Sequence, residues 1–145
     1  MGKSHIKAKK PIIDGYQFDS GEEAEYYLHL KERDDVDAIL VHPFFSLIEP
    51  FKITCQTCYG EGKVASPKTG NPIKCRRCDG TGWKERQSWT YTADFQVLYK
   101  NGKTEVIDVK GWINERFPLV RKMFEYQMGF ELTVVQKKKG KWVRR

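Results

Sequence analysis

The chain has 145 residues, the size of one ordinary domain, and is long enough to bury a hydrophobic core. No apolar stretch approaches the roughly eighteen residues of a membrane span, and no signal-peptide pattern follows the lysine-rich N-terminus. We therefore expect a cytoplasmic protein that is neither secreted nor bound to a membrane.

The positive charge is concentrated in three segments. The net charge is +7, but residues 1–10, 52–88 and 137–145 together carry +15, which leaves −8 on the rest. Basic segments of this kind are typical of nucleic-acid contacts, although like-charge runs also serve as solubilising arms or address signals. We predict DNA, double-stranded or branched, as the partner, with a basic N-terminal arm at 1–15 and a basic, phosphate-contacting C-terminal tail at 137–145.

The first regular element is a helix. Ser20 can cap its start, and Glu23 three residues later completes a capping box. The helix is expected to end near residues 33–35. The apolar run Val36–Ile48 then predicts a strand that is interrupted or bent at Pro43.

An insertion interrupts the regular elements. Residues 52–88 are rich in Gly, Pro, Thr and Cys, a composition that forms turns. After it the pattern predicts a strand at 89–99, a hairpin turn at Asn101-Gly102, a strand at 103–110, a helix from Phe117 to a C-cap at Gly129, and a strand at 130–136.

These elements predict an α/β fold. The order is helix, three strands, helix, strand, with a central mixed sheet flanked by helices. The core would consist of residues 16–51 and 89–136. The insertion would lie between the first two strands of that core.

The insertion contains two copies of one motif, Cys-x-x-Cys-x-Gly-x-Gly, which supply Cys55, Cys58, Cys75 and Cys78. This spacing lets four thiolates converge on one zinc ion, and a Cys₄ site has no open coordination position, so its role should be structural. Disulfides or a redox dithiol are the alternatives. The motif resembles the zinc-binding repeats of the DnaJ co-chaperones, without a J-domain. A zinc-dependent protein-interaction factor therefore stays open as a weaker interpretation.

A second set of residues points to catalysis. Asp108 and Lys110 would project from the same face of a strand, and a hairpin would bring Asp94 beside them. Two carboxylates can hold Mg²⁺ against a scissile phosphate while a lysine orients the attacking water. Alone, an Asp-x-Lys pair is more often an ordinary surface pair.

These residues resemble the PD-(D/E)XK nuclease superfamily, including phage-type enzymes and archaeal Holliday-junction resolvases. The resemblance rests on Ser20-Gly21-Glu22-Glu23, Tyr91-Thr92-Ala93-Asp94-Phe95 and Val106-Ile107-Asp108-Val109-Lys110-Gly111. It implies a restriction-endonuclease-like core. It also implies that Asp94, Asp108 and the Val109 carbonyl bind catalytic Mg²⁺ or Mn²⁺, that Glu23 is the helix carboxylate, with Glu22 or Glu25 as replacements, and that Lys110 is the family lysine.

The resulting hypothesis is a metal-dependent DNA endonuclease acting on branched or replicating DNA. The resemblance favours a phage-encoded enzyme in a bacterial host, and a homodimer if it makes two symmetric cuts. The alternative is a non-catalytic, zinc-containing DNA-binding protein on the same scaffold. The histidines have no ligand spacing, so packing or exposure is expected for them. Trp83, Trp89 and Trp112 could stack on bases, although packing is commoner.

Overall fold

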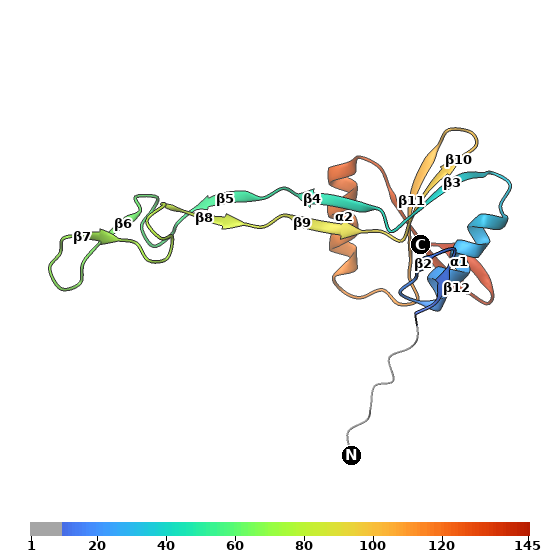
Figure 1. The fold of residues 1–145 in the computed structure, drawn as a ribbon, viewed down its shortest axis with the longest axis horizontal. Coiled ribbons are helices and arrows are strands. Elements are labelled where there is room, and N and C mark those ends of the chain that lie inside the picture. Colours follow the sequence, from blue (N-terminus) through green and yellow to red (C-terminus); the bar gives the residue numbers. More distant parts are fainter. Residues whose placement is uncertain (1–9) are drawn as a thin grey trace, which may run out of the picture. The chain divides into compact units, whose positions relative to one another are not determined.

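The computed structural model describes residues 10–145, which fold as two compact units (Figure 1). The sheet unit consists of the chain up to Phe45 together with Tyr91–Arg145, and the cysteine unit is Ser46–Thr90. The predicted insertion, 52–88, lies within the cysteine unit, which extends a few residues beyond it at each end. Among the described residues, no helix is both long and apolar enough to cross a bilayer.

A five-stranded mixed sheet forms the centre of the sheet unit. Its strands lie in the order β13-β12-β11-β10-β3, with β11 and β12 parallel and the other neighbours antiparallel. Their bounds are β3 Val36–Val41, β10 Phe95–Tyr99, β11 Thr104–Val109, β12 Leu132–Lys138 and β13 Lys141–Arg144. Asn101 and Gly102 lie in the turn between β10 and β11, as predicted. The α/β class and the mixed central sheet are therefore confirmed, and β13 is an additional strand.

Helix α1, Gly21–Glu32, covers one face of this sheet. The Ser20 hydroxyl caps it by accepting a hydrogen bond from the Glu23 N–H at 3.2 Å, and Arg33 is the C-cap. The Glu23 carboxylate accepts from the Asp19 N–H at 3.3 Å, so the capping box closes one residue earlier than predicted. Buried apolar side chains of α1 and the strands form one core: Ala24, Tyr26, Tyr27, Leu30, Phe95, Val97, Ile107, Val109 and Val135.

Helix α2, Phe117–Met128, lies on the opposite side of the sheet from α1 (Figure 1) and contacts β12. It ends at Gly129, whose left-handed φ of +78° suits a residue without a Cβ. The fully buried Phe124 anchors the helix through ring contacts with Phe45, Tyr91 and Phe130, with centroids 5.0–5.8 Å apart. This cluster of aromatic rings holds α2 in place.

Two predicted strands are each broken at the same place. The run Val36–Ile48 forms β3 and a separate strand β4, Phe44–Ile48, while residues 89–99 form β9, Trp89–Thr92, and β10. β4 and β9 pair with each other and carry the chain between the units. At the break, the His42 N–H donates to the Asp94 carbonyl at 2.9 Å and the Ala93 N–H to the Pro43 carbonyl at 3.0 Å. His42 has a left-handed φ of +54° there. Both β4 and β9 depart from the five-stranded sheet at this corner.

The basic segment 137–145 is not a separate tail, and that prediction was wrong. Residues 137 and 138 belong to β12, and Lys141–Arg144 is the edge strand β13. The Arg144 guanidinium donates two hydrogen bonds to Glu105, at 2.6 and 3.2 Å, and the Trp142 ring lies edge-on to Tyr26, with centroids 4.9 Å apart. The strand was not predicted because its many Lys and Arg residues are equally typical of a solvated tail.

The predicted N-terminal arm, 1–15, lies partly outside the described residues. Within the described part, Ile12–Ile13 (β1) and Tyr16–Gln17 (β2) already form a short hairpin. The arm therefore passes into the fold at residue 12, before its predicted boundary.

The cysteine unit contains turns, as predicted, joined by four short strands. β5, Phe51–Thr54, pairs with β8, Trp83–Arg86, and β6, Lys63–Ala65, pairs with β7, Pro72–Lys74. Each Cys-x-x-Cys-x-Gly-x-Gly motif connects one strand of the first pair to one of the second. The four cysteines, with Val64 packed against them, form the core of this unit.

Candidate functional site

The four cysteine sulfurs form a compact cluster. Cys55 Sγ lies 3.9 Å from Cys75 Sγ, Cys58 Sγ lies 3.7 Å from Cys78 Sγ, and all four sulfurs lie within 4.8 Å of one another. Four ligands at about 2.3 Å around a tetrahedral ion have edges of about 3.8 Å. All four cysteines are buried and free of disulfides, so they could hold a metal ion such as zinc.

The two motifs form matching knuckles that interlock through their glycines. The Cys55 N–H donates to the Gly82 carbonyl and the Cys75 N–H to the Gly62 carbonyl, each at 2.9 Å. A Cβ on Gly62 would lie 2.4 Å from the Gly80 oxygen, and a Cβ on Gly82 would lie 2.4 Å from the Gly60 oxygen. Only glycine allows this close backbone approach.

Backbone amides also face the sulfurs. The Gly62 N–H donates to Cys58 Sγ and the Gly82 N–H to Cys78 Sγ, each at 3.2 Å. Burial opposes ionisation of the Cys78 thiol, but the Gly82 N–H and the neighbouring cysteines lower its pKa to about 6. Because the thiolate is the form that binds metal, these amides favour ligation.

In the sheet unit, the structure brings the predicted catalytic carboxylates together. Asp94 lies at the corner between β9 and β10, and Asp108 lies near the end of β11; both are at least nine-tenths buried. Asp94 Oδ2 accepts a hydrogen bond from the Val109 N–H at 2.6 Å, which fixes the side chain across the two strands. The role of the Val109 carbonyl stays a prediction.

Lys110 completes this cluster, as the spacing predicts. Its Nζ lies 3.0 Å from Asp108 Oδ2 and 4.6 Å from the centroid of the Phe117 ring at the start of α2. Among the described residues, no group meets hydrogen-bond geometry with the buried Asp108 Oδ2, and the Lys110 ammonium is its charge partner.

The first turn of α1 directs carboxylates to the same region. Glu23 is 8 % exposed and lies close enough to Asp94 for its charge to raise the pKa of that group. Glu22 packs against Gly111, where a Cβ would come within 2.9 Å of its Oε2. Glu25 pairs with Lys137 at 2.5 Å. The structure therefore places Glu23 and Glu22, but not Glu25, beside the cluster.

The electrostatics of this cluster suit a divalent cation. Burial, followed by the adjacent Asp108 carboxylate, raises the pKa of Asp94 to about 9, and the Val109 N–H opposes this only in part. Burial likewise raises the pKa of Glu23. A cation bound among such groups would offset both the lost solvation and the mutual repulsion. Asp94 and Asp108 are the carboxylates that could hold such an ion, whereas the Glu23 carboxylate lies within 4.8 Å of ligand atoms of Asp19 and His42.

Sequence reasoning missed two neighbours of the cluster. His42, expected only to pack or be exposed, has its Nε2 3.7 Å from Glu23 Oε2, and it forms with Glu23 and Asp19 a group whose ligand atoms lie within 4.8 Å of one another. Tyr91 is partly buried, and burial and the Asp108 charge raise its pKa. The His42-Pro43 break in the first strand was the available signal for His42. Tyr91 gave none beyond its place three residues before Asp94.

The tryptophans offered for base stacking differ in their surroundings. Trp112 is 77 % exposed, whereas Trp83 is covered on one face by Lys52, whose Nζ lies 4.6 Å from the ring centroid. Trp89 is partly buried in β9. Trp112 is thus the most open of the three.

Comparison with known proteins adds a family but no activity. No curated protein and no solved structure is detectably similar to the chain. One family model, described as a protein of unknown function (DUF1064), matches residues 3–145. Because that match covers almost the whole length, the chain belongs to the DUF1064 family.

Proposed function

We propose that this protein is a metal-dependent DNA endonuclease with a PD-(D/E)XK-type core. The observation that carries the proposal is the convergence of the buried Asp94 and Asp108 carboxylates with the Lys110 ammonium, 3.0 Å from Asp108 Oδ2, and with Glu23, whose charge raises the pKa of Asp94. The order of helices and strands around the mixed sheet is compatible with that core. Buried carboxylates whose pKa is strongly raised by burial and by a neighbouring carboxylate are concentrated at functional sites.

Each side chain has a distinct part in this proposal. Asp94, held by the Val109 N–H, and Asp108 would hold Mg²⁺ or Mn²⁺, with Glu23 as a further ligand directly or through water. The bound ion would neutralise charge on the scissile phosphate and make a bound water more acidic. Lys110 would donate hydrogen bonds that orient the attacking water or the phosphate. The Phe117 ring keeps the lysine ammonium beside the carboxylates.

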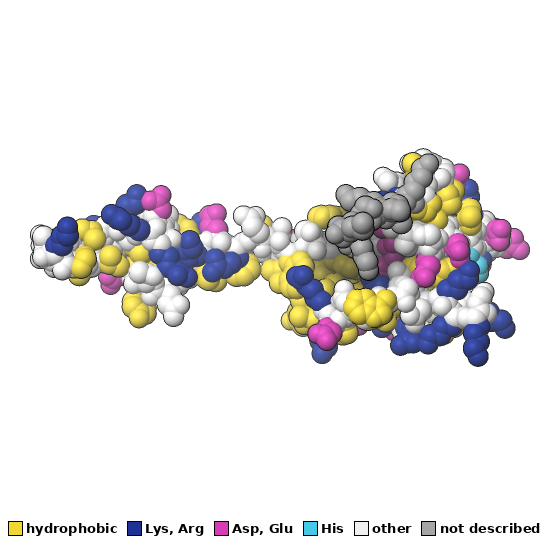
Figure 2. All heavy atoms as spheres, turned by 90° about the horizontal axis from the view of Figure 1, so that it is seen from below, with side chains coloured by type: hydrophobic (Ala, Val, Ile, Leu, Met, Phe, Trp, Pro, Cys, Tyr) yellow, Lys and Arg dark blue, Asp and Glu magenta, His cyan; other side chains and the backbone are white. Residues whose placement is uncertain are grey.

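The cysteine cluster has a structural part. We propose that it binds one zinc ion, because its S–S distances match a tetrahedral site and all four ligands are protein thiolates. Such a closed site contributes folding energy and no hydrolysis. Figure 2 shows Lys and Arg side chains spread over the visible face of the cysteine unit, with few acidic side chains between them. We propose that this unit helps to hold DNA.

The test is cleavage of labelled DNA by the zinc-loaded full chain. Plasmid, linear duplex and four-way-junction substrates are incubated with Mg²⁺, with Mn²⁺ and without either ion. We expect ion-dependent products from the wild type and at least a hundredfold loss for Asp108→Asn. Asp37→Asn, an exposed residue of β3, is the matched control and should cleave normally.

The outcomes separate the two candidate functions. Cleavage that persists in Asp108→Asn would contradict the catalytic assignment and indicate a contaminating nuclease. Salt-sensitive DNA binding without cleavage of any substrate would favour a non-catalytic binding protein, for which the cationic cysteine unit is the supporting observation. Absence of any DNA affinity would contradict both.

A further inference from the structure

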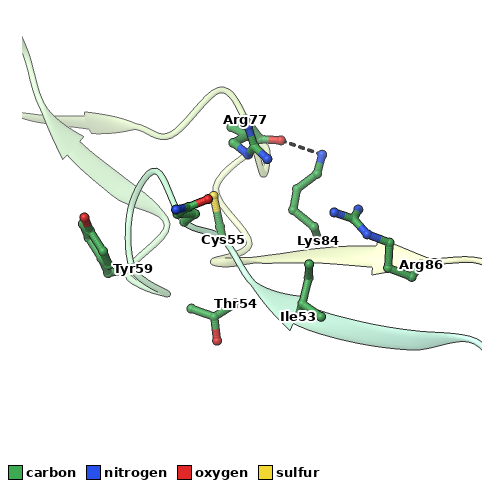
Figure 3. Close-up of a pocket in the computed structure, with 8 residues that line it drawn as sticks. Ile53, Thr54, Cys55, Tyr59, Arg77, Lys84 and Arg86 are labelled. Carbon is green, nitrogen blue, oxygen red and sulfur yellow. Dashed lines mark hydrogen bonds between the residues drawn. The ribbon is translucent and has the colours of Figure 1, made fainter.

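One side of the cysteine unit has a groove beside the first knuckle (Figure 3). Its volume is about 420 Å³, and none of the described residues that line it is acidic. Figure 3 shows Tyr59 on one side of the groove and Arg77, Lys84 and Arg86 on the other. The lining residues are Ile53, Thr54, Cys55, Gln56, Tyr59, Arg77, Lys84 and Arg86.

The cationic character of this groove follows from the alternation of β8. Successive side chains of a strand point to opposite faces, so Lys84 and Arg86 share the face away from Trp83 and Glu85. On that other face, Lys52 lies 4.0 Å from Glu85 and covers the Trp83 ring, so its charge is partly compensated. In the described part of the chain, Arg77, Lys84 and Arg86 form no ion pair. Lys84 only donates to the Arg77 carbonyl, at 2.9 Å.

Tyr59 occupies a position that its backbone disfavours. It has a left-handed φ of +53°, and its counterpart in the second knuckle, Asp79, has a φ of +55°. Asp tolerates this region well, and Asp79 also pairs with Lys74 at 2.5 Å, whereas a bulky aromatic residue is an outlier there. The Tyr59 side chain is nevertheless 82 % exposed. Packing within this chain therefore does not offset the conformational cost.

We propose that this groove binds an unpaired DNA strand, with phosphates on Arg77, Lys84 and Arg86 and a base stacked on Tyr59. Three uncompensated cations select an anionic ligand, and an exposed ring opposite them selects one that also carries planar groups. Base faces are open for stacking only where the strand is unpaired. The inference rests on the DNA binding in the proposed function and refines it: the protein prefers DNA with single-stranded or branched segments.

The test measures binding apart from cleavage. Zinc-loaded full chain carrying Asp108→Asn is titrated into a fluorescein-labelled oligothymidylate and, separately, a blunt hairpin duplex, and anisotropy is recorded over a range of salt. We expect Tyr59→Ala to weaken binding of the single strand about 5- to 100-fold and Tyr59→Phe to leave it nearly unchanged. Arg77→Ala and Arg86→Ala should each lower the salt slope by about 0.7. Arg76→Ala, a basic neighbour that does not line the groove, is the control.

A further variant separates ligand contact from folding. Tyr59→Asn suits the left-handed backbone but cannot stack well, so it should retain zinc at least as tightly as the wild type while binding the single strand as weakly as Tyr59→Ala. If the Tyr59 and arginine variants bind like Arg76→Ala, the groove assignment is overturned even where wild-type protein still cleaves DNA. Loss of binding in these variants without cleavage by the wild type would support the groove and contradict the nuclease. Loss of zinc from Tyr59→Asn would also overturn the groove assignment, since the tyrosine would then have a structural role.

Discussion

The interlocked glycines of the two knuckles allow a sharp test of the cysteine unit. Gly62 and Gly70 have nearly the same left-handed φ, +74° and +73°, but a Cβ on Gly62 would lie 2.4 Å from the Gly80 oxygen whereas a Cβ on Gly70 would meet nothing within 4 Å. Alanine at either position costs about 1 kcal/mol for the backbone conformation. At Gly62, but not at Gly70, the backbone that carries the Cys75–Gly62 hydrogen bond must also move.

We expect Gly70→Ala to cost about 1 kcal/mol and Gly62→Ala about 3–5 kcal/mol, because overpacking adds about 1–3 kcal/mol and strain on that hydrogen bond adds about 1 kcal/mol. Metal binding and folding of such a unit are coupled. Each 1.4 kcal/mol is a factor of about ten, so zinc affinity should fall roughly fivefold in Gly70→Ala and a hundredfold or more in Gly62→Ala.

The assay is competition for zinc with a chromogenic chelator of known affinity, at equal protein concentration. Gly82→Ala should match Gly62→Ala, because its Cβ would lie 2.4 Å from the Gly60 oxygen. Equal zinc affinities for Gly62→Ala and Gly70→Ala would refute the close approach of the knuckles. Unequal effects of Gly62→Ala and Gly82→Ala would refute their equivalence.

Three further predictions concern the sheet unit. The pKa of Asp94 is raised from 3.8 to about 9, so without Mg²⁺ this group destabilises the fold increasingly as the pH rises between these two values. The free energy of unfolding of Asp94→Asn should therefore exceed that of the wild type by at least about 1 kcal/mol near pH 8, equal it near pH 4, and not increase when Mg²⁺ is added. A lower melting temperature than the wild type at pH 8 would contradict the raised pKa. Phe124→Ala should lose about 3–5 kcal/mol in urea unfolding, since the ring is fully buried; a loss below about 1 kcal/mol would show that α2 is not anchored there. Burial opposes ionisation of Glu105, but Arg144 and a Tyr99 hydrogen bond lower its pKa, so this group stabilises the fold above its ordinary pKa and loses that effect as pH falls; Glu105→Gln should flatten the decline of the melting temperature below pH 5, and an unchanged decline would count against the ion pair.

The sequence predicted best what depends on local spacing. The Ser20 cap, the Gly129 C-cap and the Asn101-Gly102 turn are determined by neighbouring residues, and all are present. The clustering of the four cysteines follows from two copies of a motif whose spacing suits a tetrahedral metal site. Asp108 and Lys110 lie two apart on one strand, so their proximity also followed from local structure.

Features that depend on tertiary pairing were predicted poorly. The proline predicted the interruption after Val41 but not the change of partner strand there, so the approach of His42 to Glu23 was missed. The strand β13 was hidden because Lys and Arg suit a solvated edge as well as a tail. Its position depends on contacts of Trp142 with Tyr26 and of Arg144 with Glu105. These partners are distant in the sequence, so the periodicity of apolar residues does not reveal them.

The corner at Asp94 also bears on the order in which the chain folds. Val41 pairs with Phe95 across 54 positions of sequence, and closing a flexible loop of that length costs roughly 3–4 kcal/mol of chain entropy. Four thiolates gathered on one ion, followed by pairing of β5 with β8 and β4 with β9, would shorten the loop still to be closed to a few residues, at a saving of roughly 2 kcal/mol. A zinc ion bound by the cysteines would then act as a folding nucleus for the five-stranded sheet, and stopped-flow refolding should slow severalfold when the ion is withheld.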